Sequence, residues 1–276
     1  MGPRPVGGVV QGSIAQILAV TAYGNAFLQG RQIGEFWPEA SVFQFCRDVV
    51  FRPGESHSDL SDPVRWFADL AASTKGLRLH LSGRNDPNIS DRNSVGFVGG
   101  GSRWIIEAVG NAASSLWEPT WTVDDIEATD RKIWRVTYDC IAPQWRLAAP
   151  PSRTLEAVRT DLAGALDEIA RFAQRNQLGF IEHFVHGRAA LDAEAPFEHA
   201  YHRDLSPPGL LSLEALQVLG ACQAAWVFGG MGSWNDGAYG EELAEEGDRL
   251  SDRLFTLMQE SLVAAMNSSF EPPRQT

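Results

Sequence analysis

Cysteine and long apolar runs are scarce in this chain of 276 residues, and each scarcity excludes a class of protein. The three cysteines include no CxxC pair, which excludes a zinc ribbon and a thioredoxin-type redox motif. No run of about 18 apolar residues is present, which excludes a membrane-spanning helix. Because the thiols lie in apolar segments and no cleavage site follows the apolar residues 14–20, we expect a cytoplasmic protein with reduced cysteines.

Positive charge is also scarce: the chain has 23 basic and 35 acidic side chains, and its net charge is −12. Residues 1–150 carry 14 basic and 16 acidic groups, whereas residues 151–276 carry 9 and 19. Such an acidic C-terminal half repels nucleic acids and anionic membrane surfaces. We therefore expect neither as a partner.

Common catalytic and cofactor signatures are missing as well. The chain has no GxxxxGK[ST], no strand-GxGxxG-helix, no HExxH and no GxSxG. The glycine stretch 99–102 is followed by the strand-like residues 104–109, so it predicts a hairpin turn that needs positive φ rather than a phosphate loop. No cofactor is predicted.

The first half has the period of a sheet. Apolar and polar residues alternate at 77–82 and 133–139, which is typical of strands with one wet face, and this favours an antiparallel sheet. Further strands are predicted near 42–51, 95–98, 103–109 and 116–123. A helix is predicted at 63–72, because Asp62 can cap it and Pro63 fits its first position. The apolar residues 14–20 fit a helix or a strand.

The second half has the period of helices, and the change follows Pro150 and Pro151. Helices are predicted at 153–176, from 180 onward, at 212–228 and at 241–266. Strands first and helices second predict an α+β fold, with a mainly antiparallel β subdomain at 1–150 and a helical subdomain at 151–276. We expect the two to form one compact unit.

Four of the six histidines lie close together in the sequence. His183 and His186 are one helical turn apart, and His199 and His202 repeat that spacing beside Asp204. Imidazoles at this spacing, with carboxylates, can bind a first-row metal. The alternative is a polar helix face that collects histidines without a task. No metal is predicted, and these five residues are the candidates if one binds.

Seven of the nine tryptophans lie in the first half, where they can fill the core or line a groove. Arg103 and Trp104 are candidate binding residues, because tryptophan beside arginine is typical of recognition surfaces. Strand alternation places their side chains on opposite faces of the sheet.

The loop 229–237 is rich in glycine and carries Trp234, Asn235 and Asp236. Its glycines can let the backbone approach a ligand, with the two polar side chains as contacts. The alternative is a structural connector between two helices. In either case we expect a glycine with positive φ and a buried or partly buried Trp234.

These patterns favour a binding or interaction module with its site near residues 229–237. The partner is a small molecule or another protein, and the sequence defines neither its identity nor the oligomeric state. The alternative function is a metal-dependent enzyme, a hydrolase, that uses the histidine cluster.

Overall fold

The computed structural model describes residues 11–54, 58–83, 90–146, 153–197, 200–229, 231–236 and 238–270. Within these ranges the α-helices are α1 Gly12–Leu28, α2 Pro63–Leu70, α3 Asp91–Ser94, α4 Leu155–Arg175, α5 Ile181–Ala190, α6 Leu213–Ala224 and α7 Ala244–Asn267. Two short 3₁₀ helices are η1 Ser41–Phe43 and η2 Glu241–Leu243. The strands are β1 Cys46–Arg52, β2 Thr74–Ser82, β3 Arg103–Gly110, β4 Ser114–Val123 and β5 Trp134–Trp145.

The predicted α+β fold is confirmed, and the sheet is mixed. Its strand order is β1-β5-β4-β3-β2. Three of the four pairings are antiparallel, as alternation in the sequence predicts, whereas the edge strand β1 pairs with β5 in parallel. Residues 147–152, where the sequence changes its period, lie outside the described residues, so the boundary near residue 150 stays a prediction.

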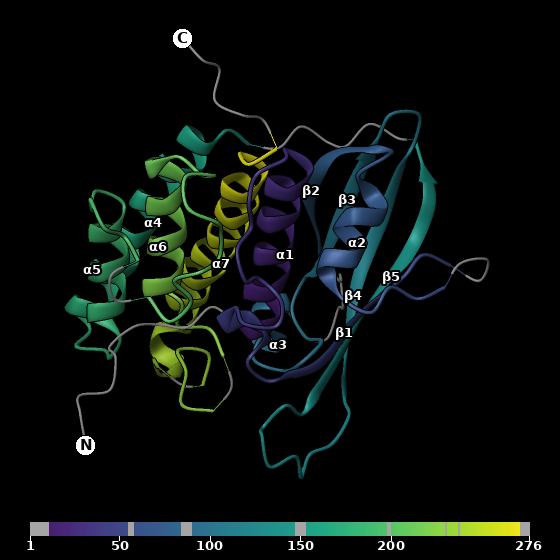
Figure 1. Cartoon of the computed structure of the whole chain (residues 1–276). Helices are drawn as coiled ribbons and strands as arrows, with labels where there is room; N and C mark the ends of the chain where they lie inside the picture. The colour runs from purple at the N-terminus through teal and green to yellow at the C-terminus, as the bar shows by residue number, and fades with distance from the viewer. Residues whose placement is uncertain are drawn as a thin grey trace.

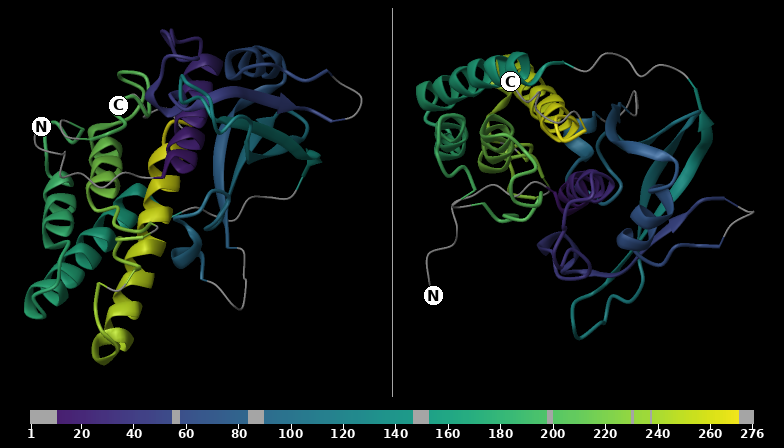
Figure 2. Two further views of the ribbon diagram at one scale, coloured as in Figure 1. Left: turned by 90° about the horizontal axis from the view of Figure 1, so that it is seen from below. Right: turned by 45° about the horizontal axis from the view of Figure 1, so that its top comes forward.

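Helix α1 lies between the sheet and the helices α4 to α7 (Figure 1). Figure 2 shows the same arrangement from two other directions, with the sheet on one side of α1 and the helical half on the other. The apolar segment 14–20 is therefore a helix and not a strand, and it is buried on every side. A helix that is apolar all round needs such a central position, because no face of it gains from contact with water.

The face of the sheet that meets α1 and α2 is lined with aromatic rings. Phe51 of β1 stacks on Trp66 of α2 at 4.3 Å between ring centroids and on Tyr138 of β5 at 4.6 Å. The Asp62 side chain accepts a hydrogen bond from the backbone N–H of Arg65, as the sequence predicts for the start of α2.

Two asparagines occupy the free edge of β2. The Asn25 side chain of α1 accepts from the N–H of Leu77 at 2.6 Å and donates to its carbonyl at 2.9 Å. The Asn267 side chain of α7 does the same for Leu79, at 2.7 and 3.0 Å. The two side-chain amides thus replace a neighbouring strand and satisfy backbone groups that otherwise form an adhesive edge.

The predicted strand at 95–98 is wrong, because this segment is the turn that follows α3. Ser90 caps α3, and the chain then folds back on the helix end. A Cβ on Gly100 would lie 1.9 Å from the carbonyl oxygen of Ser94, so only glycine allows this close return. Gly99 and Gly101 have φ values of +76° and +77°, which confirms the predicted need for positive φ.

The long predicted helices are present, since α4 and α7 cover most of 153–176 and 241–266. Their amphipathic faces pack against each other and against α1 and α6. Among the described residues, no helix is both long and apolar enough to cross a lipid bilayer.

We expect Asn267→Ala to lower the free energy of unfolding by about 1–3 kcal/mol, because it leaves two partly buried backbone groups of Leu79 without partners. Urea denaturation followed by circular dichroism measures the change. Asn111→Ala, in the exposed turn between β3 and β4, is the matched control and should change stability by less than about 0.5 kcal/mol. Equal stability of the two variants would contradict the proposed role of the Asn267 side chain.

Candidate functional site

The loop between α6 and η2 meets both expectations drawn from its sequence. Gly232 has a φ of +79°, and the Trp234 side chain is 1% exposed. The indole N–H of Trp234 donates to the Ser251 hydroxyl of α7 at 2.7 Å. Its ring packs edge-on against Phe184 of α5 at 5.1 Å and against Tyr239 at 5.4 Å. Trp234 therefore anchors the loop in the helical core.

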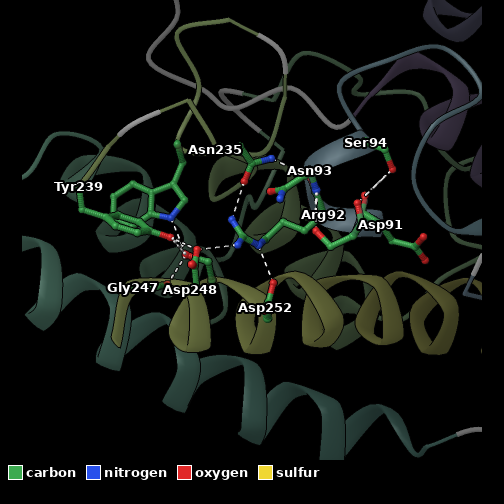
Figure 3. Close-up of polar contacts among 12 residues, drawn as sticks. Asp91, Arg92, Asn93, Ser94, Asn235, Tyr239, Gly247, Asp248 and Asp252 are labelled. Atoms are coloured by element: carbon green, nitrogen blue, oxygen red, sulfur yellow. Dashed lines mark hydrogen bonds and ion pairs between the residues drawn. The ribbon is translucent and has the colours of Figure 1, made fainter. Parts of the chain in front are cut away.

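Asn235 joins this loop to the short helix α3, more than 140 residues earlier in the chain. Its amide oxygen accepts from Arg92 Nη1 at 2.9 Å, and its amide nitrogen donates to the Arg92 carbonyl at 2.7 Å. Figure 3 shows the Arg92 side chain between Asn235 and helix α7. The pair of bonds fixes the α3 segment and the loop against each other.

Arg92 is 5% exposed, and its charge is matched by carboxylates of α7. Nε donates to Asp252 at 2.6 Å and Nη2 to Asp248 at 2.9 Å (Figure 3). Burial, the largest single effect, lowers the pKa of Arg92, but the hydrogen bond and charge of Asp252, the charge effect of Tyr239 and the hydrogen bond of Asp248 together raise it above its ordinary value. A buried guanidinium with all these partners holds its neighbours firmly and is costly to disrupt.

Asp236 is exposed and accepts from the backbone N–H of Gly232 at 2.9 Å. This bond closes the turn within the loop. Trp234 and Asn235 thus hold the loop in place, whereas the side chain of Asp236 faces water. Whether the predicted residues Trp234, Asn235 and Asp236 also contact a ligand stays a prediction.

Arg103 and Trp104 lie at the start of β3, immediately after the α3 segment. As alternation predicts, their side chains point in different directions. Arg103 makes two bonds to the Glu118 carboxylate of β4, at 2.7 and 2.5 Å, on the wetter face of the sheet. Trp104 is 7% exposed and belongs to the core. In the structure the two residues contribute to the sheet, and a binding role for them stays a prediction.

The described histidine candidates lie in different surroundings. His183 Nδ1 lies 3.2 Å from the carbonyl of Ala224, and His186 is exposed on α5. His202 contacts Ser41 instead, and His199 lies outside the described residues. Within the part of the chain that the structure describes, no group of three or more His, Cys, Asp or Glu side chains has the arrangement of a metal site.

His202 and Asp204 take part in a partly buried set of hydrogen bonds rather than in a histidine cluster. His202 Nδ1 lies 2.8 Å from the Ser41 hydroxyl of η1. That hydroxyl donates to Asp204 Oδ1 at 2.5 Å, and the Ser41 backbone N–H donates to Oδ2 at 2.6 Å. Asp204 therefore accepts from the backbone N–H at the start of η1, and these hydrogen bonds join the two halves of the molecule.

Sequence reasoning missed Arg92, Ser41 and the α7 carboxylates Asp248 and Asp252. No local pattern marks them, because the bonds that join Arg92 to Asp248 and Asp252, and Ser41 to Asp204, span more than 140 residues of the chain. A single hint was present for Arg92, since it follows Ser90 and Asp91, a plausible helix start.

We expect Asn235→Ala to lower the free energy of unfolding by about 1–3 kcal/mol, because it leaves Arg92 with two unsatisfied groups. Asp236→Ala, in the exposed turn of the same loop, should cost less than about 1 kcal/mol. Thermal and urea denaturation of the two variants give the comparison. A stable Asn235→Ala variant would show that the Arg92 network does not depend on this amide, and would favour a ligand role for Asn235.

Comparison with models of protein families, with curated proteins and with solved structures found no match. The function of this chain must therefore be argued from its own surface.

Proposed function

We propose that this protein is an interaction module that binds an apolar and basic segment of another protein. The proposed contact, called the loop surface below, consists of the turn after α3 and the loop after α6. The observation that carries the proposal is the exposure of their apolar side chains. Met231 is 98% exposed, Phe97 67% and Val98 46%.

These side chains lie on two segments that hydrogen bonds join to each other. In the chain Met231 is four residues from Asn235 and Phe97 is five residues from Arg92, and the Arg92–Asn235 bonds join the two segments. Gln11, just before α1, also donates to the Phe97 carbonyl at 3.1 Å. A surface that is ordered in advance loses less conformational entropy on binding.

The charges near the loop surface select the partner. Asp248 and Asp252 are about half exposed beside Arg92. The exposed acidic residues Asp236, Glu241 and Glu242 follow Met231 in the chain. Apolar anchors among carboxylates favour a segment that has both apolar and basic side chains, such as a basic amphipathic helix. Methionine adapts its shape to such partners readily.

The expected compartment is the cytoplasm, and this too is a proposal. It is supported by the three free cysteines, of which Cys46 and Cys222 are buried. Burial raises the pKa of the Cys46 thiol to about 12, so this thiol is unreactive at neutral pH. Among the described residues no observation favours the alternative of a metal-dependent hydrolase.

The proposal is tested with a defined probe, a 14-residue amphipathic peptide of leucine and lysine that carries a fluorescent label. Fluorescence anisotropy at physiological salt measures its affinity. We expect the double variant Phe97→Ser, Met231→Ser to bind at least about tenfold more weakly than the wild type, which corresponds to about 1.4 kcal/mol. Both residues are exposed, so stability should change by less than about 1 kcal/mol.

Two controls test separately whether the affinity depends on the loop surface and on the basic charge of the peptide. Val185→Ser removes an apolar side chain that is 51% exposed on α5, and it should leave the affinity unchanged. A peptide with glutamate in place of lysine tests the need for basic charge. An equal loss of peptide affinity in the Val185 variant, or no loss of affinity in the double variant, would contradict the loop surface as the contact. Equal binding of the acidic peptide would contradict the basic partner.

A further inference from the structure

Two connecting segments from the two halves of the molecule lie side by side and are joined by hydrogen bonds. We call this contact the seam. Residues 29–45 form one side and residues 201–209 the other. Arg31 donates to the Gly209 carbonyl at 2.8 Å, and Gln44 donates to the Tyr201 hydroxyl at 2.5 Å. The bonds of Ser41 to Asp204 lie between them in the sequence.

His202 is a titratable side chain buried in the seam, with 2% of its surface exposed. The single hydroxyl proton of Ser41 goes to Asp204, so the bond of 2.8 Å between Ser41 and the imidazole requires a proton on Nδ1. The backbone of His202 is fixed from α6. The Gln223 amide accepts from its N–H at 3.3 Å and donates to its carbonyl at 3.1 Å. These two bonds fix the backbone from which the imidazole reaches Ser41.

The groups around His202 are mostly neutral. Ser41 of η1 and Gln223 of α6 carry no charge, and the ring of Tyr201 packs edge-on at 4.8 Å. Asp204 is the charged group that acts on the imidazole, and it also accepts from the Ser41 hydroxyl. Tyr23 of α1 stays neutral, because burial and then Asp204 raise its pKa to about 12. For His202, burial lowers the pKa more than Asp204 raises it.

We propose that the seam is an acid-sensitive latch, which is closed while His202 is neutral and opens when the imidazole is protonated. The neutral ring fits the closed seam because it donates one bond and is otherwise covered. Protonation adds a charge and a second N–H donor to a site shielded from water, which disfavours the closed state. The stabilisation by neutral His202 is therefore complete above pH 6.5, the ordinary value for histidine, and falls as the pH drops below it.

Hydrogen–deuterium exchange at pH 7.5 and 5.5, corrected for the intrinsic pH dependence of exchange, tests the latch. An exposed imidazole is about 90% protonated at pH 5.5, so the opening equilibrium should rise by up to about tenfold. We expect faster exchange in peptides from 29–45 and 201–211, and unchanged exchange in α4 and α7. Unchanged exchange of the seam peptides would overturn the proposal.

Matched variants show whether His202 is the sensor. Asn in His202→Asn keeps a donor near the position of Nδ1 and does not titrate, so its seam should exchange equally at both pH values. His186→Gln, at an exposed position of α5, should keep the full difference in exchange between the two pH values. A persisting response in His202→Asn would overturn the proposal. If that variant does not fold, NMR titration of the wild-type imidazole decides. The His202 signal must titrate below 6.5 together with the seam signals, and any other course contradicts the latch.

Discussion

The complete burial of α1 is the constraint on which the rest of this structure depends. An apolar helix of 17 residues cannot present any face to water, so it needs a sheet on one side and helices on the other. Its polar side chains must then find partners inside the protein. Gln16 contacts Cys46 and the Tyr138 hydroxyl, and Asn25 contacts Leu77 and Ser269. These bonds reach both halves of the chain and fix their positions around α1.

A central helix that precedes the sheet explains why the chain needs long connections. The segment 29–45 carries the chain from the end of α1 to β1, and the segment 191–212 joins α5 to α6. Such segments carry many backbone polar groups, and these need partners when they are covered. The seam meets this need through Ser41, His202 and Asp204, and the loop after α6 meets it through Arg92 and Asn235. Most polar side chains singled out by their residue type are therefore used in the fold.

Periodicity predicted the elements well, because it reports on a face that is buried or wet. The alternation at 77–82 and the apolar stripe of 153–176 correspond to β2 and α4. Periodicity failed at 95–98, where local backbone geometry decides the structure. The apolar residues Val95, Phe97 and Val98 suggested a strand, but they form the turn that follows the helix capped by Ser90. Periodicity also could not predict that β1 pairs with β5 in parallel. A strand at the sheet edge has the same alternation of apolar and polar residues in either direction.

The candidate site shows where a single sequence reaches its limit. Trp234 was found because glycines and a tryptophan stand out locally, whereas Arg92 was not, because its partners come from α7 and the loop after α6. Polar residue type alone does not distinguish a ligand contact from a structural one, since both need a matched partner. Burial and hydrogen bonds show which side chains the fold already uses. Asn235 is committed to Arg92, whereas the side chain of Met231 is almost fully exposed. In this fold, recognition is therefore best sought among the apolar side chains that packing leaves uncovered.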